Sequence, residues 1–203
     1  MAKSGILFVI SGPSGAGKGT VRGKVMEREV GLAFSVSATT RVPRPGEIDG
    51  LHYHFITKEE FEKMIENGDF IEYVAKFQNY YGTPKAQVES LLADGKDVLL
   101  EIETIGANNV RRMFPDAVMI FITPSTFEEL ERRLLYRGTE SEKLQKLRLR
   151  IAKKEYKSMR RYDYIAINDD LDQCVSLICS IIKAERAKRS RNKDIVEQFN
   201  QIK

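Results

Sequence analysis

The chain has 203 residues, a formal net charge of +4, and 42% hydrophobic and 31% charged residues, values typical of one soluble globular domain. A core of this size needs no disulfide or metal to hold it together. No run of 18 apolar residues occurs, and the apolar run near the N-terminus leads into glycines, not to a cleavage site, so we expect no membrane span, no signal peptide and a cytoplasmic location.

The first predicted elements are a strand over residues 6 to 10 and a helix over 18 to 29, joined by SGPSGAGKGT. Gly12, Gly17 and Lys18 satisfy the GxxxxGK pattern of a phosphate-binding loop. Glycines let backbone N–H groups turn inward around an anion, the helix N-terminus adds partial positive charge, and the lysine reaches the terminal phosphates. The residues predicted to bind the nucleotide here are Gly12, Pro13, Ser14, Gly15, Ala16, Gly17, Lys18, Gly19 and Thr20.

Gly19 stands where such loops usually carry a serine or threonine that binds Mg²⁺. Mg²⁺ keeps several waters and binds through few protein oxygens, so we expect either Thr20 or water to take that place. The GKGT ending also appears in adenylate kinases, which favours a nucleoside monophosphate kinase over a GTPase switch.

Residues 33 to 95 break the pattern that the rest of the chain follows, with short alternating pieces such as LHYHFI and FIEYVAKF between turn-rich stretches. We interpret this part as a small mixed subdomain inserted into the core. Thr57 and Glu60 form a predicted capping box at the start of a helix that ends at Asn67, where Gly68 provides the stop.

Further apolar runs at 97 to 102, 117 to 122 and 164 to 167 predict strands, and helical patterns cover 105 to 113, 126 to 136, 143 to 160 and 171 to 189. This alternation predicts an α/β fold with a parallel sheet covered by helices on both faces. The polar stretch RGTESEK, at 137 to 143, is typical of the hinge of a mobile lid.

The positive charge is concentrated near the C-terminus, where residues 183 to 193 hold six basic side chains against Glu185. Aromatic residues do not alternate with these charges, so we expect a solvated helix and no nucleic-acid or membrane surface. Cys174 and Cys179 are five residues apart in a predicted helix and face different directions, which favours two buried free thiols.

The stretch SVSATTRVPRPGE, then Tyr53, FIEY, NYYGTP and the later NDD at 168 to 170, resembles guanylate kinase from about residue 5 to residue 189. The resemblance implies a P-loop kinase core (1–34, 96–136 and 161–203), a GMP-binding subdomain (35–95), and a lid region with its following helix (137–160). It also implies transfer of the γ-phosphate of ATP to GMP or dGMP with Mg²⁺, small-molecule substrates and no nucleic-acid partner; the oligomeric state stays open.

Arg41 and Arg44 lie three residues apart in a proline-stiffened loop, and guanidinium groups match phosphate oxygens bidentately. Together they can clamp the acceptor monophosphate, to which Tyr53 and Tyr81 add donors, as the resemblance implies. A solvated loop is the alternative, which the phosphate loop elsewhere in the chain disfavours.

Guanine recognition falls to Glu72, Ser37 and Thr83 by resemblance. A carboxylate accepts from guanine N1–H and the exocyclic amine, whereas adenine would leave it unpaired. Glu101 and Glu103 alternate at the end of a strand and so point the same way, at the edge where ligands of parallel sheets bind. The resemblance implies that these acids lie near the acceptor nucleotide and the metal.

Phosphoryl transfer requires cations around the transferred group. Arg133, Arg137 and Arg148 flank the predicted lid and match arginines of the family, so with Lys18 and Arg41 they are the predicted catalytic and ATP-binding cations; ordinary helix-surface arginines are the alternative. Asn168 is placed near the ATP base by resemblance, and Asp169 and Asp170 are expected to cap the helix that follows.

Two other interpretations remain: a catalytically inert interaction module of the same fold, and a related kinase with another acceptor, such as a ribose bisphosphate kinase. The intact Lys18 disfavours the first, and Glu72 with NYYGT disfavours the second. The chain departs from the family's usual residues at Ala38, Gln78, Glu103 and Ile105, none of which removes a required charge.

Overall fold

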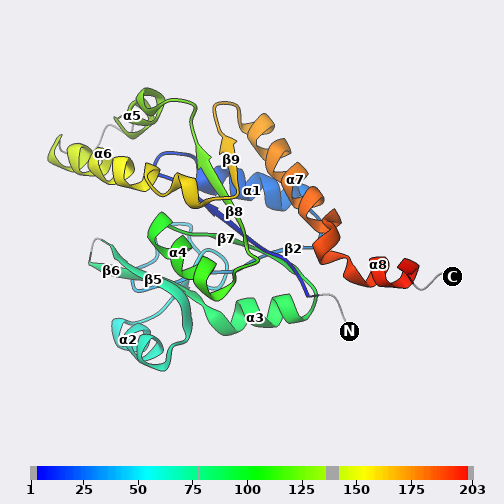
Figure 1. The fold of residues 1–203 in the computed structure, drawn as a ribbon. Coiled ribbons are helices and arrows are strands. Elements are labelled where there is room, and N and C mark those ends of the chain that lie inside the picture. The colour runs from blue at the N-terminus through cyan, green and yellow to red at the C-terminus, as the bar shows by residue number, and fades with distance from the viewer. Residues whose placement is uncertain (1–3, 77, 136–141, 201–203) are drawn as a thin grey trace.

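The computed structural model describes residues 4–76, 78–135 and 142–200. At its centre is a five-stranded parallel sheet in the order β2-β7-β1-β8-β9 (Figure 1). The strands are β1 (Leu7–Ser11), β2 (Leu32–Phe34), β7 (Asp97–Glu101), β8 (Val118–Thr123) and β9 (Tyr164–Ile167). The first strand of the chain therefore lies in the middle of the sheet, and β7 and β8 flank it.

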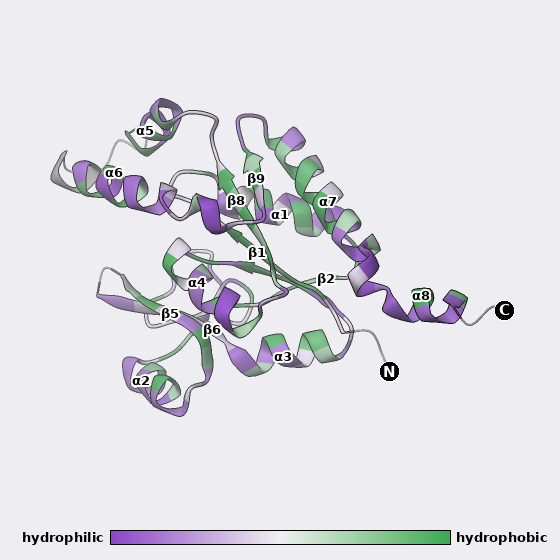
Figure 2. Cartoon of the chain, viewed as in Figure 1, coloured by the Kyte–Doolittle hydropathy of each residue, from purple (hydrophilic) through white to green (hydrophobic). Residues whose placement is uncertain are grey.

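Alternate residues of β1 serve the two faces of this sheet, as the period of a strand requires. Phe8 and Ile10 pack toward α1 (Lys18–Arg28) and α7 (Leu171–Ala187), with α5 (Phe127–Leu135) and α6 (Glu142–Tyr156) at the edge of that cluster. Leu7 and Val9 pack toward α3 (Lys85–Ala93) and α4 (Thr104–Met113). Figure 2 shows the matching pattern, apolar central strands with hydrophilic outer faces on the helices around them.

A second, four-stranded sheet has the order β4-β3-β6-β5 and mixes parallel and antiparallel pairs. It consists of β3 (Ala38–Thr39), β4 (His54–Phe55), β5 (Phe70–Lys76) and β6 (Asn79–Pro84), with α2 (Lys58–Asn67) beside it. Phe61 of α2 is fully buried and stacks on Phe70 at a centroid distance of 4.3 Å. The predicted capping box of Thr57 and Glu60 is present, and Gly68 ends α2 with a φ of 72°.

The predicted α/β fold with a parallel core and an inserted mixed sheet is confirmed. Among the elements that the sequence analysis did not predict are β2, which has only three residues and hence no readable period, the helix α3, and the C-terminal helix α8 (Lys193–Asn200). The helix predicted over 143 to 160 ends earlier, at Tyr156, and a 3₁₀ turn, η1 (Met159–Arg161), follows. Among the described residues, no helix is both long enough and apolar enough to cross a membrane.

The expected solvated basic helix near the C-terminus is wrong for part of its length, because several of these cations form ion pairs within the fold. Arg186 donates to Asp97 at 2.6 Å and to the buried carboxylate of Glu29 at 2.9 Å. Arg191, in the short helix η2 (Arg189–Arg191), contacts Glu185 at 3.3 Å. These pairs fasten the end of α7 to the sheet, which a charge count along the sequence could not reveal. Cys174 and Cys179 are buried free thiols, as predicted.

The stack of Phe61 in the second sheet predicts a specific loss of stability. Phe61→Ala removes a fully buried ring that contacts Phe70 and Tyr80, and we expect it to cost about 3–5 kcal/mol. Hydrogen exchange of the β5 and β6 amides measures this loss. Phe199→Ala is the matched control, because that ring is 63% exposed on α8; equal effects of the two variants on β5 and β6 would contradict the assigned core.

Candidate active site

The phosphate loop leaves the carboxyl end of β1 in a conformation that its glycines make possible. Gly12, Gly15 and Gly17 have φ values of 150°, 89° and 84°. A Cβ on Gly12 would lie 2.1 Å from the carbonyl oxygen of Ile122 in β8, so the loop crosses its neighbouring strand at a distance that only glycine permits. The sequence-predicted strand, loop and helix therefore form as expected.

Asn168 fastens this loop from the end of β9. Its side-chain Nδ2 donates to the carbonyl oxygen of Ala16 at 2.7 Å, and a Cβ on Gly17 would lie 2.5 Å from the same nitrogen. The carbonyl oxygen of Asn168 accepts from Arg133 Nη1 at 2.8 Å. Asn168 is 7% exposed, so in this structure its amide binds the loop itself. Asp170 caps α7 through Gln173 N, as predicted, whereas the side chain of Asp169 accepts from Ser125 N.

The ammonium group of Lys18 folds back onto the loop. Its Nζ donates to the carbonyl oxygens of Gly12 at 2.7 Å and Pro13 at 3.2 Å. Those bonds hold the cation over the concave side of the loop, where a phosphate can replace the carbonyl oxygens as its acceptors.

A cavity of about 480 Å³ opens next to Lys18, between the main sheet and the second sheet. Most of the residues predicted for the acceptor nucleotide line it, although they come from distant parts of the chain: Ser37, Arg44, Tyr53, Glu72, Tyr81, Glu101 and Glu103. Lys18 and Gly19 form its border with the phosphate loop, while Thr20 is exposed. Loop and cavity thus form one continuous site.

Arg41 lies at the edge of this cavity, and its guanidinium group forms a bidentate ion pair with Glu47. Nη1 and Nη2 each donate to a carboxylate oxygen of Glu47 at 2.9 Å, and Arg44 N donates to the same carboxylate at 2.7 Å. The hydrogen bonds from Arg41, with that of the Arg44 amide, lower the pKa of Glu47 to about 2, so it stays ionised. The guanidinium of Arg41 also lies over the ring of Tyr53, 5.5 Å from its centroid. Glu47 therefore orders the loop that carries both arginines.

Glu72 lies on β5 and is 5% exposed. Its Oε1 accepts a hydrogen bond of 2.8 Å from Thr83 Oγ1 on the neighbouring strand β6. Burial raises the pKa of the Glu72 carboxyl to about 7; the negative charge of Glu103 adds to the rise, and the hydrogen bond of Thr83 opposes it. A buried carboxyl of this kind gains most from a ligand that brings hydrogen-bond donors.

Glu101 lies between the phosphate loop and the cavity. It is the last residue of β7, and a Cβ on Gly19 would lie 3.8 Å from its Oε1. Glu103 lies beyond the strand, at the N-cap of α4, and also lines the cavity. Arg22 of α1 faces Glu101 with a nitrogen-to-oxygen distance of 3.5 Å.

The residues of the cavity wall that the sequence prediction missed include Arg22, Phe34, Glu47 and His52. Arg22 lies over the Phe34 ring, with its guanidinium carbon 4.3 Å from the centroid. Four residues separate Arg22 from Lys18, so both project from one side of α1, which a helical wheel could have shown. The places of Glu47 and His52 depend on how the insert folds, whereas Phe34 is the last residue of β2 in the main sheet.

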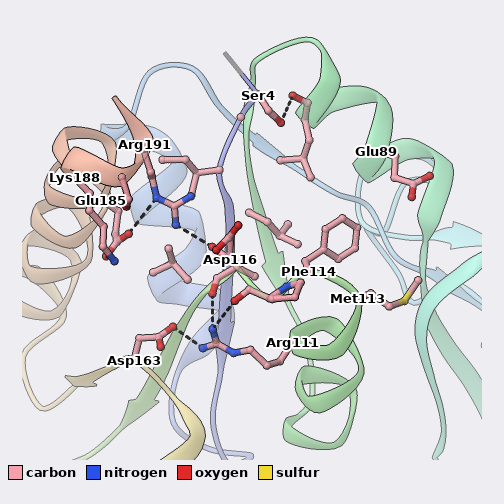
Figure 3. Close-up of a pocket in the computed structure, with 18 of the residues that line it drawn as sticks. Ser4, Glu89, Arg111, Met113, Phe114, Asp116, Asp163, Glu185, Lys188 and Arg191 are labelled. Atoms are coloured by element: carbon pink, nitrogen blue, oxygen red, sulfur yellow. Dashed lines mark hydrogen bonds and ion pairs between the residues drawn. The ribbon is translucent and has the colours of Figure 1, made fainter. Parts of the chain in front are cut away.

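A larger cavity, of about 990 Å³, opens at the opposite end of the strands of the main sheet (Figure 3). Its arginines already have partners. Arg111 donates to Asp163 at 2.6 Å and to two backbone carbonyl oxygens, and Arg191 contacts Glu185. The cavity beside Lys18 borders the phosphate loop and this one does not, so we take the cavity beside Lys18 as the candidate nucleotide site.

The predicted lid arginines fall into three groups. Arg133 binds Glu129 at 2.6 Å and the carbonyl oxygen of Asn168, which keeps it beside the phosphate loop. Arg148 lies on α6. Arg137 lies outside the described residues.

Comparisons with known proteins agree with this geometry. A family model described as guanylate kinase matches residues 4–185. The guanylate kinase of Oceanobacillus iheyensis is 48% identical over 200 residues, which cover 98% of this chain and 96% of that protein. The guanylate kinase of Caldanaerobacter subterraneus subsp. tengcongensis is 49% identical over 193 residues, or 95% and 94% of the two chains. The crystal structure of guanylate kinase from Anaplasma phagocytophilum superposes with a TM-score of 0.80 at 33% sequence identity. The match covers 99% of this chain and 98% of that chain.

The raised pKa of Glu72 predicts how stability changes with pH. The folded state holds a proton on Glu72 between its ordinary pKa of 4.5 and about 7, so folding stability falls as pH rises through this window. Because a tenfold change in proton affinity is worth about 1.4 kcal/mol, the loss is about 3 kcal/mol by pH 8. Glu72→Gln removes the group that causes this loss, so the variant should gain stability relative to the parent between pH 5 and pH 8.

Thermal melts across this range measure the effect. Glu66→Gln, which changes an exposed glutamate of α2, is the matched control and should follow the parent. A constant difference in melting temperature between Glu72→Gln and the parent would contradict the assignment.

Proposed function

Because the chain belongs to the guanylate kinase family, we propose that the phosphate loop and the cavity beside it are its ATP and GMP sites. The activity is that of a guanylate kinase: the γ-phosphate of ATP passes to GMP, giving ADP and GDP. We further propose dGMP as a second acceptor and the cytoplasm as the location. One observation carries the assignment of the sites: Lys18 and the buried Glu72 line the same 480 Å³ cavity.

The ATP half consists of the loop from Gly12 to Thr20. Its backbone N–H groups and the N-terminus of α1 would surround the phosphates, and Lys18 would exchange its loop carbonyl partners for phosphate oxygens. Asn168 would lie beside the ATP base, and its side chain holds the loop through Ala16. In the proposal it fixes the shape of the phosphate site.

The acceptor phosphate would bind between Arg41, Arg44 and the hydroxyls of Tyr53 and Tyr81. The hydrogen bonds of Arg41 and Arg44 to Glu47 support this, because they keep both arginines in one ordered loop at the cavity edge. Two charge-assisted, bidentate contacts would then hold the attacking phosphate toward the phosphate loop.

Guanine would bind at the inner end of the cavity, where Glu72 accepts from N1–H and the exocyclic amine. Thr83 supports this role by holding one carboxylate oxygen, which orients the other. Ser37 and Glu103, on the same cavity wall, would complete the polar contacts to the base. Adenine offers no such pair of donors and would leave a buried carboxylate unpaired, which costs about 1–3 kcal/mol or more.

In the transfer itself, an oxygen of the GMP phosphate attacks the γ-phosphorus while the bond to the β–γ bridging oxygen breaks. Lys18, Arg133, Arg137 and Arg148 would balance the charge on the transferred group. The contact between Arg133 and the carbonyl oxygen of Asn168 supports its place beside the loop. We propose that the lid region with its following helix (137–160) closes over ATP and that 35–95 move as the GMP-binding subdomain, which would expel water.

The donor set fits Mg²⁺, because the carboxylate of Glu101 lies beside Gly19 at the boundary of the two halves, and hard cations take oxygen ligands. Glu101, Thr20 and water are the proposed ligands. When bound with ATP, Mg²⁺ neutralises charge on the β- and γ-phosphates. Glu101 is held in place by Arg22.

A coupled assay of ADP production tests the proposed acceptor. We expect turnover with GMP and dGMP, and rates with AMP, UMP and CMP at least about a hundredfold lower, because only guanine pairs both donors with Glu72. The absence of GMP-dependent turnover would favour an inert interaction module, and a preference for AMP would refute the role given to Glu72.

Two charge removals separate the two phosphate sites. Lys18→Ala should lower kcat about a thousandfold while GMP binding, measured by calorimetry, survives. Arg41→Ala should chiefly raise the KM for GMP, about ten- to hundredfold, because it removes a charged bidentate contact. The matched controls are Lys24→Ala on the exposed side of α1 and Arg189→Ala on η2. A reversed pattern would mean that the two sites are exchanged.

A further inference from the structure

Gly106, in the first turn of α4, lies directly against the carboxylate of Glu72. A Cβ built on Gly106 would lie 2.1 Å from Oε2, 2.7 Å from Cδ and 3.0 Å from Cγ of Glu72. These atoms belong to one side chain; Oε2 and Cδ are closer than a real Cβ comes to a neighbour, and Cγ is as close as the tightest real contacts. The position of the carboxylate therefore depends on the missing side chain at residue 106.

The backbone of α4 does not itself call for glycine here. Gly106 is helical, and it is not among the described glycines with positive φ. Glycine inside a helix costs about 1 kcal/mol relative to alanine. Gly23 of α1 offers a contrast, since it is also helical and a Cβ there would meet nothing within 4 Å. The space taken by Glu72 is the feature that separates the two positions.

The other side of the carboxylate is already occupied. Oε1 is held by Thr83 at 2.8 Å, and the side chain is enclosed between β5, β6 and α4 with 5% exposure. A methyl group at residue 106 would push Oε2 out of its place. Glu72 could then move only by rotating away from Thr83 or by turning its carboxylate out of the plane in which a base edge meets it.

We propose that Gly106 is a positioning residue for acceptor selectivity, which lets the Glu72 carboxylate lie flat against α4 with both oxygens directed for guanine. The inference rests on the role proposed above for Glu72. It adds a second determinant of base choice, on another element and without any contact of its own to the nucleotide.

Gly106→Ala tests the proposal. We expect the KM for GMP to rise about ten- to hundredfold and the preference for GMP over IMP, which lacks the exocyclic amine, to fall by a similar factor. The KM for ATP should stay within about twofold of the parent value. Gly23→Ala is the matched control and should leave all three values unchanged.

A cycle with Glu72→Ala separates a positioning role from general damage, because the smaller side chain removes the overlap with Ala at 106. In that background Gly106→Ala should change the KM for GMP by less than about twofold. If the two substitutions change the KM for GMP by factors that simply multiply in the double variant, the proposal is overturned. If the single variant Gly106→Ala does not fold, the double variant should fold and match the kinetics of Glu72→Ala; a double variant that also fails to fold would refute the assigned contact.

The same cycle distinguishes failure of the inference from failure of the proposed function. If Glu72→Ala leaves the preference for GMP over IMP unchanged, Glu72 does not read the base and the proposed function loses its acceptor assignment. If Glu72→Ala lowers this preference and Gly106→Ala does not, the acceptor assignment stands and only the role of Gly106 is refuted.

Discussion

The parallel pairing of β1 between β7 and β8 is the constraint on which the rest of the site depends. Its register sets Ile10 opposite Glu101 on one side and Ser11 opposite Phe121 on the other. Because parallel strands end at the same edge of a sheet, the phosphate loop and the acidic end of β7 emerge side by side there. The proposed donor and acceptor sites therefore meet at that edge, although their motifs lie far apart in the sequence.

Close packing then gives the two halves their shape. The loop crosses β8 where Gly12 lies against the carbonyl oxygen of Ile122, and Asn168 holds it through Ala16. On the acceptor side, Glu72 is held between Thr83 and Gly106. In both places a glycine leaves room for a polar group that must be in one position. The cost is entropic, because glycine loses more conformational freedom on folding than any other residue.

The sequence prediction was most accurate where the pattern is local. The strand, glycine loop and helix around Lys18 form as predicted, and so do the capping box at Thr57 and the four main apolar strands. It missed β2, whose three residues show no period, and the ion pairs of Arg186, which join positions more than 80 residues apart. Such pairs leave no local trace.

By itself, the sequence determined that the chain binds nucleotide phosphates, because the spacing of glycines and Lys18 is a local property of one turn. It also supplied, through resemblance, the residues expected around the acceptor. Only the tertiary structure decided that most of these line one cavity, that Glu47 holds Arg41, and that Gly106 limits where Glu72 can lie. The cavity and the contact of Gly106 with Glu72 arise from packing between distant elements, and the bond of Glu47 to Arg41 depends on how their loop folds back on itself. Such distances are not encoded in any local sequence pattern.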